Sequence, residues 1–172
     1  MNKAVMLSIR PKWCEKIASG EKTIEVRKTR PNLPTPFKVY IYCSQGRDAR
    51  RLRGSWGKVV GEFTCDAITR VNICGFWDDS GKQLDNRLKE TCLTSKEFLD
   101  YLGEKVGYGW HISDLRIYDT LKELSEFKTL CRVDADCCAC PYYNYIKMDC
   151  DGRVIGRPPQ SWCYVEALKD GY

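Results

Sequence analysis

Histidine is almost absent from this sequence, because His111 is the only one among 172 residues. Mechanisms that need two histidines, such as HExxH zinc sites and paired-histidine ribonuclease chemistry, are therefore excluded. The sequence also contains neither a GxGxxG nor a GxxxxGK[ST] pattern, so it supports neither a dinucleotide-binding fold nor a P-loop nucleotide hydrolase. A lone histidine beside a tryptophan usually packs or makes a satisfied hydrogen bond, and His111 fits that role or a binding role.

Long apolar runs are missing as well. Lys3, Arg10 and Lys12 interrupt the start of the chain, and no run approaches the roughly 20 apolar residues of a membrane-spanning helix. With 43% hydrophobic residues, the chain of 172 residues is long enough for one domain with a proper core. We therefore expect a single domain over residues 1–172 that is soluble, cytoplasmic and not attached to a membrane.

Positive charge is concentrated near the start of the chain. Residues 1–60 hold 14 Lys and Arg against 4 Asp and Glu, a net charge of +10, whereas residues 61–172 hold 14 against 19, a net charge of −5. Arg50, Arg51 and Arg53 belong to an arginine-rich, glycine-flanked segment, which predicts an exposed loop between two strands. Such arginines are suited to gripping phosphates, although a solvated loop that only aids solubility has the same pattern.

The pattern of apolar and turn residues predicts several short strands with few helices. Pro11 suits the first turn of a helix at about 11–19, and the capping box at 94–97 opens a second helix that runs to 103. A helical turn is expected at 121–126. The expected strands cover 4–9, 23–27, 38–43, 58–65, 67–73, 110–115 and 162–168. This order lacks the regular strand and helix alternation of a doubly wound sheet, and it favours a barrel.

Residues 20–27, Gly-Glu-Lys-Thr-Ile-Glu-Val-Arg, form the most informative segment. In the strand expected there, Ile24 and Val26 share one face, while Thr23, Glu25 and Arg27 share the other. One strand therefore presents a hydroxyl, a carboxylate and a guanidinium together, with a lysine just before it.

Within this segment, Gly20, Lys22, Glu25 and Arg27 resemble the signature of ASCH domains, which are related to the PUA RNA-binding domains. The resemblance covers about residues 4–130 and 157–168, and it is to a small stand-alone ASCH protein of the bacterial or phage type. It implies an α+β fold, namely a PUA-like, mostly antiparallel β-barrel flanked by short helices, with the charged motif in a cleft. ASCH proteins have been assigned or proposed as RNA binders, as regulators, and as small hydrolases or nucleases.

The resemblance implies a nucleic-acid site in a basic cleft around the motif of Gly20, Lys22, Glu25 and Arg27, with RNA or a nucleotide as partner. Arg27 would donate to a phosphate or base carbonyl, Glu25 would accept from a base amino group, and Lys22 would supply a point charge. Glu25 and Arg27 are close enough to pair directly and leave Lys22 free, although a structural salt bridge explains such a pair equally well. The predicted binding residues are Arg10, Lys22, Thr23, Glu25, Arg27, Arg50, Arg51, Arg53, Trp110, His111, Gln160 and Trp162.

Two tryptophans are the candidates for base stacking. Trp110 and Trp162 each stand at a junction between a loop and a strand, beside a polar neighbour. Aromatic residues at such positions are more often part of the core. The rigid segment 157–162, with its two prolines and Gln160, is expected to form one wall of the cleft.

A hydrolase is the alternative function, either an amidohydrolase or a metal-independent ribonuclease, with Lys22 and Glu25 as catalytic groups. Lys22 would then have to be neutral part of the time, which requires desolvation or a nearby cation. ASCH-like enzymes that deacetylate N4-acetylcytidine use a lysine, a threonine and a glutamate. Lys22 matches the lysine, Glu25 stands where those enzymes have the threonine, and Glu97 and Glu104 lie in the region comparable to the glutamate.

Eleven cysteines in a chain without a secretion signal predict reduced thiols rather than a disulfide scaffold. Five of them crowd into an insert at about 131–156, where four thiolates would form a structural zinc site. The spacing differs from paired CxxC knuckles, so free or oxidisable thiols are the alternative, and a protein-docking role of the insert is also open. The candidate zinc ligands are Cys131, Cys137, Cys138, Cys140 and Cys150.

Overall fold

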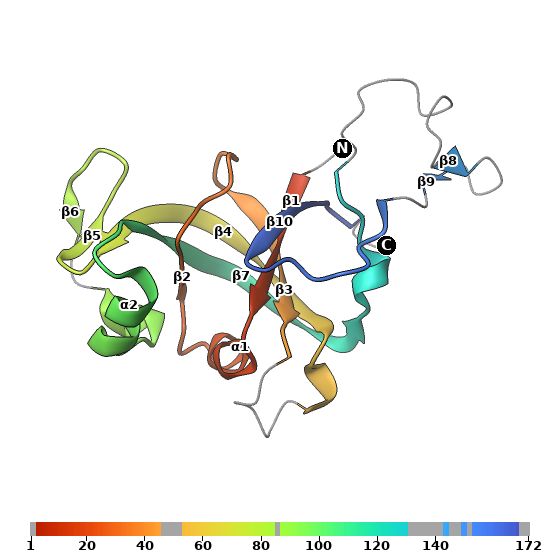
Figure 1. Ribbon diagram of the computed structural model, residues 1–172, viewed down its shortest axis with the longest axis horizontal. Coiled ribbons are helices and arrows are strands. Elements are labelled where there is room, and N and C mark those ends of the chain that lie inside the picture. The colour runs from red at the N-terminus through yellow and green to blue at the C-terminus, as the bar shows by residue number, and fades with distance from the viewer. Residues whose placement is uncertain are drawn as a thin grey trace.

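The computed structural model describes residues 3–45, 53–84, 87–130, 143–144, 149–150 and 153–168 (Figure 1). Its main feature is an eight-stranded sheet in which only the β1–β3 pair is parallel. A separate pair is formed by β8 (Tyr143–Asn144) and β9 (Asp149–Cys150). The strands of the main sheet are β1 (Lys3–Ile9), β2 (Ile24–Arg27), β3 (Phe37–Cys43), β4 (Lys58–Asn72), β5 (Gly75–Trp77), β6 (Gln83–Leu84), β7 (Gly107–Lys122) and β10 (Trp162–Glu166). The predicted mostly antiparallel α+β fold is confirmed.

The long strands β4 and β7 run side by side through the middle of the sheet (Figure 1). Their register shifts at three places along the ladder, and such bulges bend a strand and increase its twist. The two strands expected at 58–65 and 67–73 are therefore one bent strand. Close contact with β7 explains the glycine in the bend, because a Cβ at Gly61 would lie 2.5 Å from the carbonyl oxygen of Arg116.

The sheet curves but does not close into the expected barrel. Its paired strands run in the order β10, β1, β3, β4, β7 and β2, and among the described residues β2 pairs only with β7. The unpaired edge of β2 faces β1 across a seam that side chains bridge, since Arg27 of β2 donates to the backbone of Ser8 in β1. The seam between β2 and β1 is where the charged motif lies.

Both predicted helices are present and end close to where the sequence indicated. Helix α1 (Pro11–Ala18) begins with its proline at the first turn, and Gly20 after it has a φ of +78°. Helix α2 (Ser95–Leu102) begins with the predicted capping box, in which Thr94 and Glu97 each bond the other's backbone N–H. Three short 3-10 turns, η1 (Arg53–Ser55), η2 (Leu88–Thr91) and η3 (Leu124–Glu126), complete the described helical segments.

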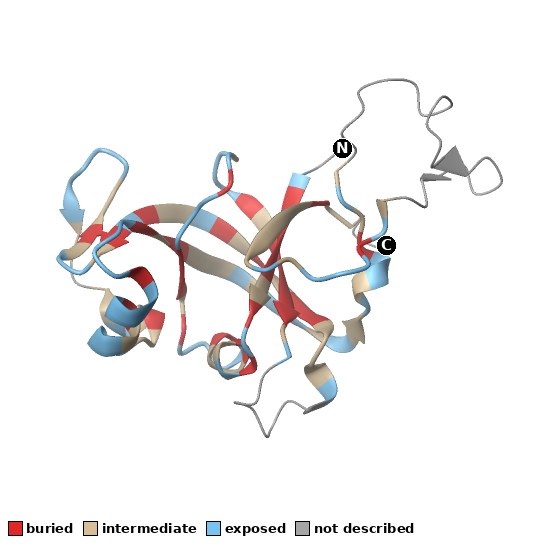
Figure 2. Cartoon of the chain, viewed as in Figure 1, coloured by how far each residue is buried: buried red, intermediate tan, exposed pale blue. Residues whose placement is uncertain are grey.

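The core lies along the strands, where buried residues are concentrated (Figure 2). The largest cluster joins apolar residues of β1, β3 and β4 with Trp110 of β7 and with α1. A second cluster, which includes Val26 and Phe98, holds α2 against β2 and the end of β4. The motif strand is therefore packed against α2 through Val26.

The six cysteines whose side chains the structure describes are free of disulfide bonds. Cys14, Cys43 and Cys65 are buried, and burial raises the pKa of Cys65 to about 12. The predicted zinc ligands Cys131, Cys137, Cys138 and Cys140 lie outside the described residues, and only the backbone of Cys150 is described, in β9. No group of potential metal ligands occurs among the residues that the structure describes, so the zinc site stays a prediction.

No helix in the described part of the chain is long and apolar enough to cross a membrane.

Candidate nucleotide pocket

The charged face of β2 points into the interior of the curved sheet, not to solvent. Glu25 lies opposite Trp110 in the antiparallel ladder, and residues directly opposite share a face. Because Trp110 belongs to the core, Glu25 and Arg27 also face inward. All four residues of β2 are buried, so both faces of the strand are covered.

Lys22, Glu25 and Arg27 form a buried ion-paired triad. One oxygen of Glu25 lies 3.1 Å from Nζ of Lys22, and the other lies 3.0 Å from Nη2 of Arg27. The three residues are only 2%, 6% and 8% exposed. Buried charges require partners of opposite sign, and each carboxylate oxygen here faces one cation.

The expectation that Lys22 stays free to face a ligand is wrong. Besides its contact with Glu25, Nζ donates to the backbone oxygens of Ile24 at 2.9 Å and of Thr91 at 2.6 Å. An ammonium group has three N–H bonds, and all three have acceptors here. Lys22 therefore ties η2 to β2 and holds Glu25 in place.

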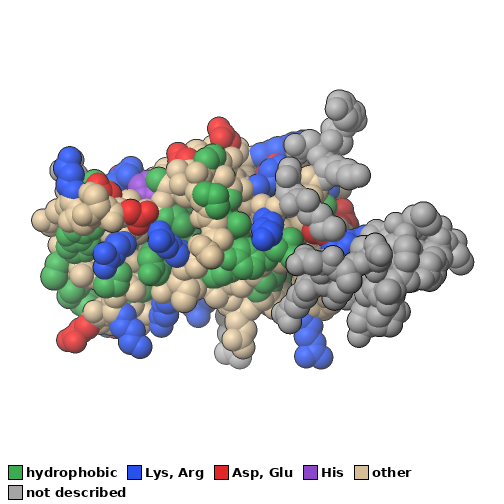
Figure 3. All heavy atoms as spheres, turned by 90° about the horizontal axis from the view of Figure 1, so that it is seen from above, with side chains coloured by type: hydrophobic (Ala, Val, Ile, Leu, Met, Phe, Trp, Pro, Cys, Tyr) green, Lys and Arg blue, Asp and Glu red, His purple; other side chains and the backbone are tan. Residues whose placement is uncertain are grey.

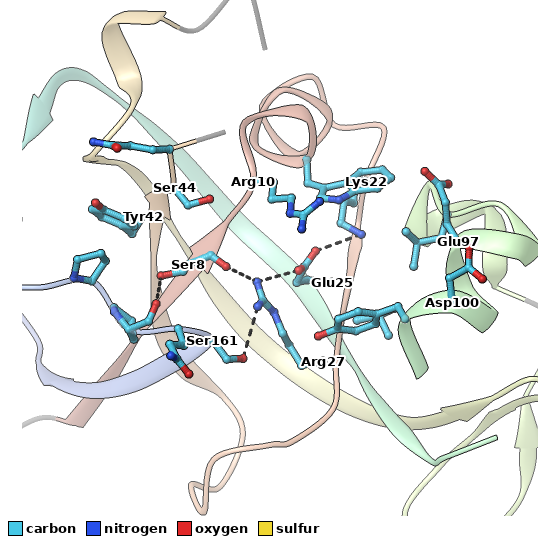
Figure 4. A pocket seen from close by; sticks show the side chains of 18 residues that line it. Ser8, Arg10, Lys22, Glu25, Arg27, Tyr42, Ser44, Glu97, Asp100 and Ser161 are labelled. Atoms are coloured by element: carbon cyan, nitrogen blue, oxygen red, sulfur yellow. Dashed lines mark hydrogen bonds and ion pairs between the residues drawn. The ribbon is translucent and has the colours of Figure 1, made fainter. Parts of the chain in front are cut away.

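Arg27 bridges the seam. Its Nη2 donates to the carbonyl oxygen of Ser8 at 2.6 Å, and Nη1 lies 3.5 Å from the hydroxyl of Ser161 (Figure 4). The hydroxyl of Ser8 in turn donates to the carbonyl oxygen of Pro159 at 2.6 Å. One guanidinium thus connects β2, β1 and the segment before β10 where backbone pairing is missing.

A cavity of about 880 Å³ opens over this triad. The triad forms its floor, α2 forms one side, and Ser44 and Tyr42 lie on the other side (Figure 4). Its lining holds three positive and three negative side chains, so it is not the uniformly basic cleft that the sequence indicated. The lining residues are Ser8, Arg10, Trp13, Lys22, Glu25, Val26, Arg27, Tyr42, Ser44, Gln45, Leu93, Glu97, Asp100, Tyr101, Pro158, Pro159, Gln160 and Ser161.

Several polar groups in the lining are not used by the protein itself. The side chains of Arg10, Tyr42, Asp100 and Gln160 make no hydrogen bond or ion pair with any residue in the described ranges. They include a guanidinium that only donates and a carboxylate that only accepts. A ligand in the cavity would find both kinds of partner.

The structure brings together five of the predicted binding residues. The cavity is lined by Arg10, Lys22, Glu25, Arg27 and Gln160. The first four lie near the start of the chain and Gln160 lies near its end. The prolines before Gln160 form part of the wall, as the sequence indicated.

Neither Thr23, which directly precedes β2, nor His111, which lies opposite Ile24 on the other face of the ladder, lines the cavity. His111 Nδ1 accepts from Arg87 at 3.2 Å, so the neutral ring carries its proton on Nε2, 3.2 Å from the hydroxyl of Thr69. Arg87 also makes two 2.7 Å bonds to Glu90, whose carboxylate lies 3.3 Å from the hydroxyl of Thr23. His111 therefore has the first role that the sequence indicated, that of a histidine whose hydrogen bonds are satisfied within the protein.

This environment predicts a pH-dependent stability. Burial, and secondarily the charge of Arg87, lower the pKa of His111 below its ordinary value of 6.5, against the smaller effects of Asp66 and Glu90. The unfolded chain therefore binds a proton more readily, and stability is lost as pH falls below about 6.5. Urea unfolding between pH 5 and 7.5 should show this loss in the wild type and a flatter profile in His111→Gln. An equal slope in both proteins would contradict the assignment.

The two tryptophans are placed differently from what base stacking requires. Trp110 is 0% exposed and packs edge-on against Phe37 at 5.7 Å between ring centroids, so no face is open to a base. Trp162 packs against Trp110 and Tyr164, donates its indole N–H to Thr29, and does not line the cavity.

The predicted phosphate-binding residues Arg50 and Arg51 lie outside the described residues, and Arg53 begins η1.

Sequence reasoning missed nine lining residues, namely Ser8, Trp13, Val26, Tyr42, Ser44, Gln45, Leu93, Asp100 and Tyr101. A signal for Asp100 was present, because it follows Glu97 by three residues in α2 and so shares its face. Glu97 does line the cavity, whereas Glu104 does not. The others are brought in by the curvature of the sheet and by contacts distant in sequence, which no local pattern contains.

Three solved structures of one protein have a similar fold. The crystal structure of ASCH from Zymomonas mobilis matches with a TM-score of 0.58 and 19% identity over 97% of this chain and 88% of that chain. A tyrosine-to-phenylalanine variant of that protein gives 0.59 at 18% identity, over 97% and 91% of the two chains. A serine-to-alanine variant gives 0.56 at 19% identity, over 97% and 89%. No protein-family model and no curated protein matches the sequence.

The chain is therefore an α+β protein with a curved, mostly antiparallel sheet and a pocket at its open seam. It has the fold of an ASCH domain, which confirms what residues 20–27 indicated.

Proposed function

We propose that this protein binds RNA by taking one of its nucleotides into the pocket at the seam. A free nucleotide would bind in the same pocket. The proposal rests mainly on one observation: the polar side chains of Arg10, Tyr42, Asp100 and Gln160, which have no partner in the part of the chain that the structure describes, line one cavity. Its volume of about 880 Å³ is within the range of small-molecule sites. The association of PUA-like folds with RNA supports the same partner.

The balance of charge in the lining favours one phosphate over several. Three cations face three anions in the pocket, and two of the cations, Lys22 and Arg27, are already paired with Glu25. Arg10 is then the guanidinium suited to a phosphate. On the face seen in Figure 3, basic side chains lie dispersed among acidic and apolar ones, so the described part of this face offers no long basic track for a nucleic-acid backbone.

The geometry of Lys22 supports binding better than hydrolysis. A catalytic lysine must present a lone pair to the substrate, whereas each of the three N–H bonds of Lys22 points to an acceptor in the protein. The triad therefore serves better as a fixed floor than as a source of a nucleophile.

Salt dependence tests the proposal. Binding of a labelled short single-stranded RNA, followed by fluorescence anisotropy, should weaken as salt rises. Arg10→Gln should reduce the slope of log affinity against log salt by about 0.7, which is the contribution of one single-strand phosphate. Arg116→Gln, which removes an exposed arginine of β7 outside the pocket, is the matched control and should leave the slope unchanged.

Two results would overturn the proposal. One is the absence of RNA and nucleotide binding at low salt. The other is an equal slope for the wild type and Arg10→Gln, which would place the phosphate contact elsewhere.

A further inference from the structure

The pocket contains three carboxylates, and two of them are already engaged. Glu25 contacts Lys22 and Arg27 with one oxygen each. Glu97 contacts Lys12 at 2.8 Å and caps α2 through Thr94. The ion pair with Lys12, together with the bonds from Thr94, lowers the pKa of Glu97 to about 2. The oxygens of both groups are therefore largely taken by contacts within the protein.

The third carboxylate, Asp100, is different. It lies beside Glu97 on the pocket side of α2 (Figure 4), and it makes no hydrogen bond or ion pair with a described residue. A carboxylate without a proton accepts hydrogen bonds and cannot donate them. The α2 side of the pocket therefore offers an acceptor that is free to bind a ligand.

The rest of the pocket offers hydrogen-bond donors. Tyr42 lies on the side away from α2, its hydroxyl has no partner among the described residues, and Arg10 supplies an unpaired guanidinium (Figure 4). A ligand that matches this arrangement has a donor at one end and acceptors, such as a phosphate, at the other. A nucleotide whose base carries an exocyclic amino group has this polarity.

We propose that Asp100 selects nucleotides whose base carries an exocyclic amino group, such as cytosine and adenine, by accepting a hydrogen bond from it. This inference rests on the proposed function, since it assigns specificity within the same pocket. Asp and Glu accept from the amino group of cytosine in known base recognition. Uracil and hypoxanthine carry a carbonyl oxygen at that position, and a carboxylate repels it.

The size of the preference follows from the exposure of Asp100. A well-formed contact to a base edge is worth about 1–3 kcal/mol, or a factor of roughly 5 to 150. Asp100 is on the exposed side of α2, where water competes with the ligand. We therefore expect a preference of about tenfold, near the lower end of this range.

Two matched pairs of ligands test this inference by calorimetry. CMP against UMP, and AMP against IMP, each exchange an amino group for a carbonyl on a ring of the same size. The wild type should bind CMP and AMP about tenfold more tightly than UMP and IMP. Asp100→Asn should remove most of this difference, because an amide offers N–H groups to a carbonyl as well as an oxygen to an amine. Glu104→Gln removes an acidic side chain outside the pocket, and it should retain the preference.

The outcomes separate the two proposals. If all four nucleotides bind the wild type equally, or if Asp100→Asn retains the preference, the role of Asp100 is overturned while nucleotide binding stands. If neither the nucleotides nor RNA bind at low salt, the proposed function fails, and the specificity fails with it. Thermal unfolding of Asp100→Asn and Glu104→Gln is the control for folding, and both variants should unfold at the temperature of the wild type.

Discussion

Replacing Glu25 by alanine is expected to destabilise the protein by about 3–5 kcal/mol, the cost of removing one partner from a buried ion pair. The substitution leaves Lys22 and Arg27, which are 2% and 8% exposed, facing each other without an anion. It therefore removes favourable contacts and adds repulsion between two cations in a site that water barely reaches. Urea unfolding at neutral pH measures the change.

Glu21→Ala is the matched control for this prediction. Glu21 also pairs with a lysine, Lys16, but both side chains are substantially exposed. Exposed pairs contribute about 0–1 kcal/mol, so this variant should unfold almost like the wild type. Equal losses in both variants would show that the triad is not buried in solution.

Replacing Trp110 by alanine should cost about 3–5 kcal/mol as well, for a different reason. The side chain is 0% exposed and fills the space between Phe37 and Trp162 in the main apolar cluster. Alanine leaves a cavity that the curved sheet cannot collapse, whereas Trp110→Phe keeps most of the contacts and should cost less. The indole N–H has no hydrogen-bond partner among the described residues, so phenylalanine forfeits no polar contact there.

The same variants separate a core role from base stacking. If Trp110 belongs to the core, Trp110→Phe keeps the RNA affinity of the folded protein, measured well below its unfolding temperature. A loss of RNA affinity in Trp110→Ala without a loss of stability would instead indicate that the ring contacts a base.

The sequence was sufficient for the two helices and for the motif. Pro11, Gly20 and the capping box at Thr94 act through local geometry, so both helices were found near their observed ends. The alternation in 23–27 correctly put Glu25 and Arg27 on one face and Ile24 and Val26 on the other. The motif in residues 20–27 by itself also indicated the ASCH fold.

What the sequence left open is where each face points. Thr23 continues the alternation of Glu25 and Arg27, yet it bonds with Glu90 outside the pocket, because it precedes the regular part of β2. The third partner of Lys22 is the carbonyl oxygen of Thr91, 69 residues away. Such contacts depend on tertiary packing, and no spacing within one segment encodes them. The same holds for the curvature that places Tyr42 and Asp100 in one cavity.

The bridge that Arg27 makes across the seam has a consequence for experiments on this protein. Because Arg27 bridges β2 and β1 and also lines the pocket, a substitution there changes the shape of the site and the integrity of its walls at once. Lost binding in an Arg27 or Glu25 variant is therefore ambiguous between a missing contact and a deformed pocket. Arg10 and Asp100, which the fold does not need, are the positions where a change in affinity reports on the ligand alone.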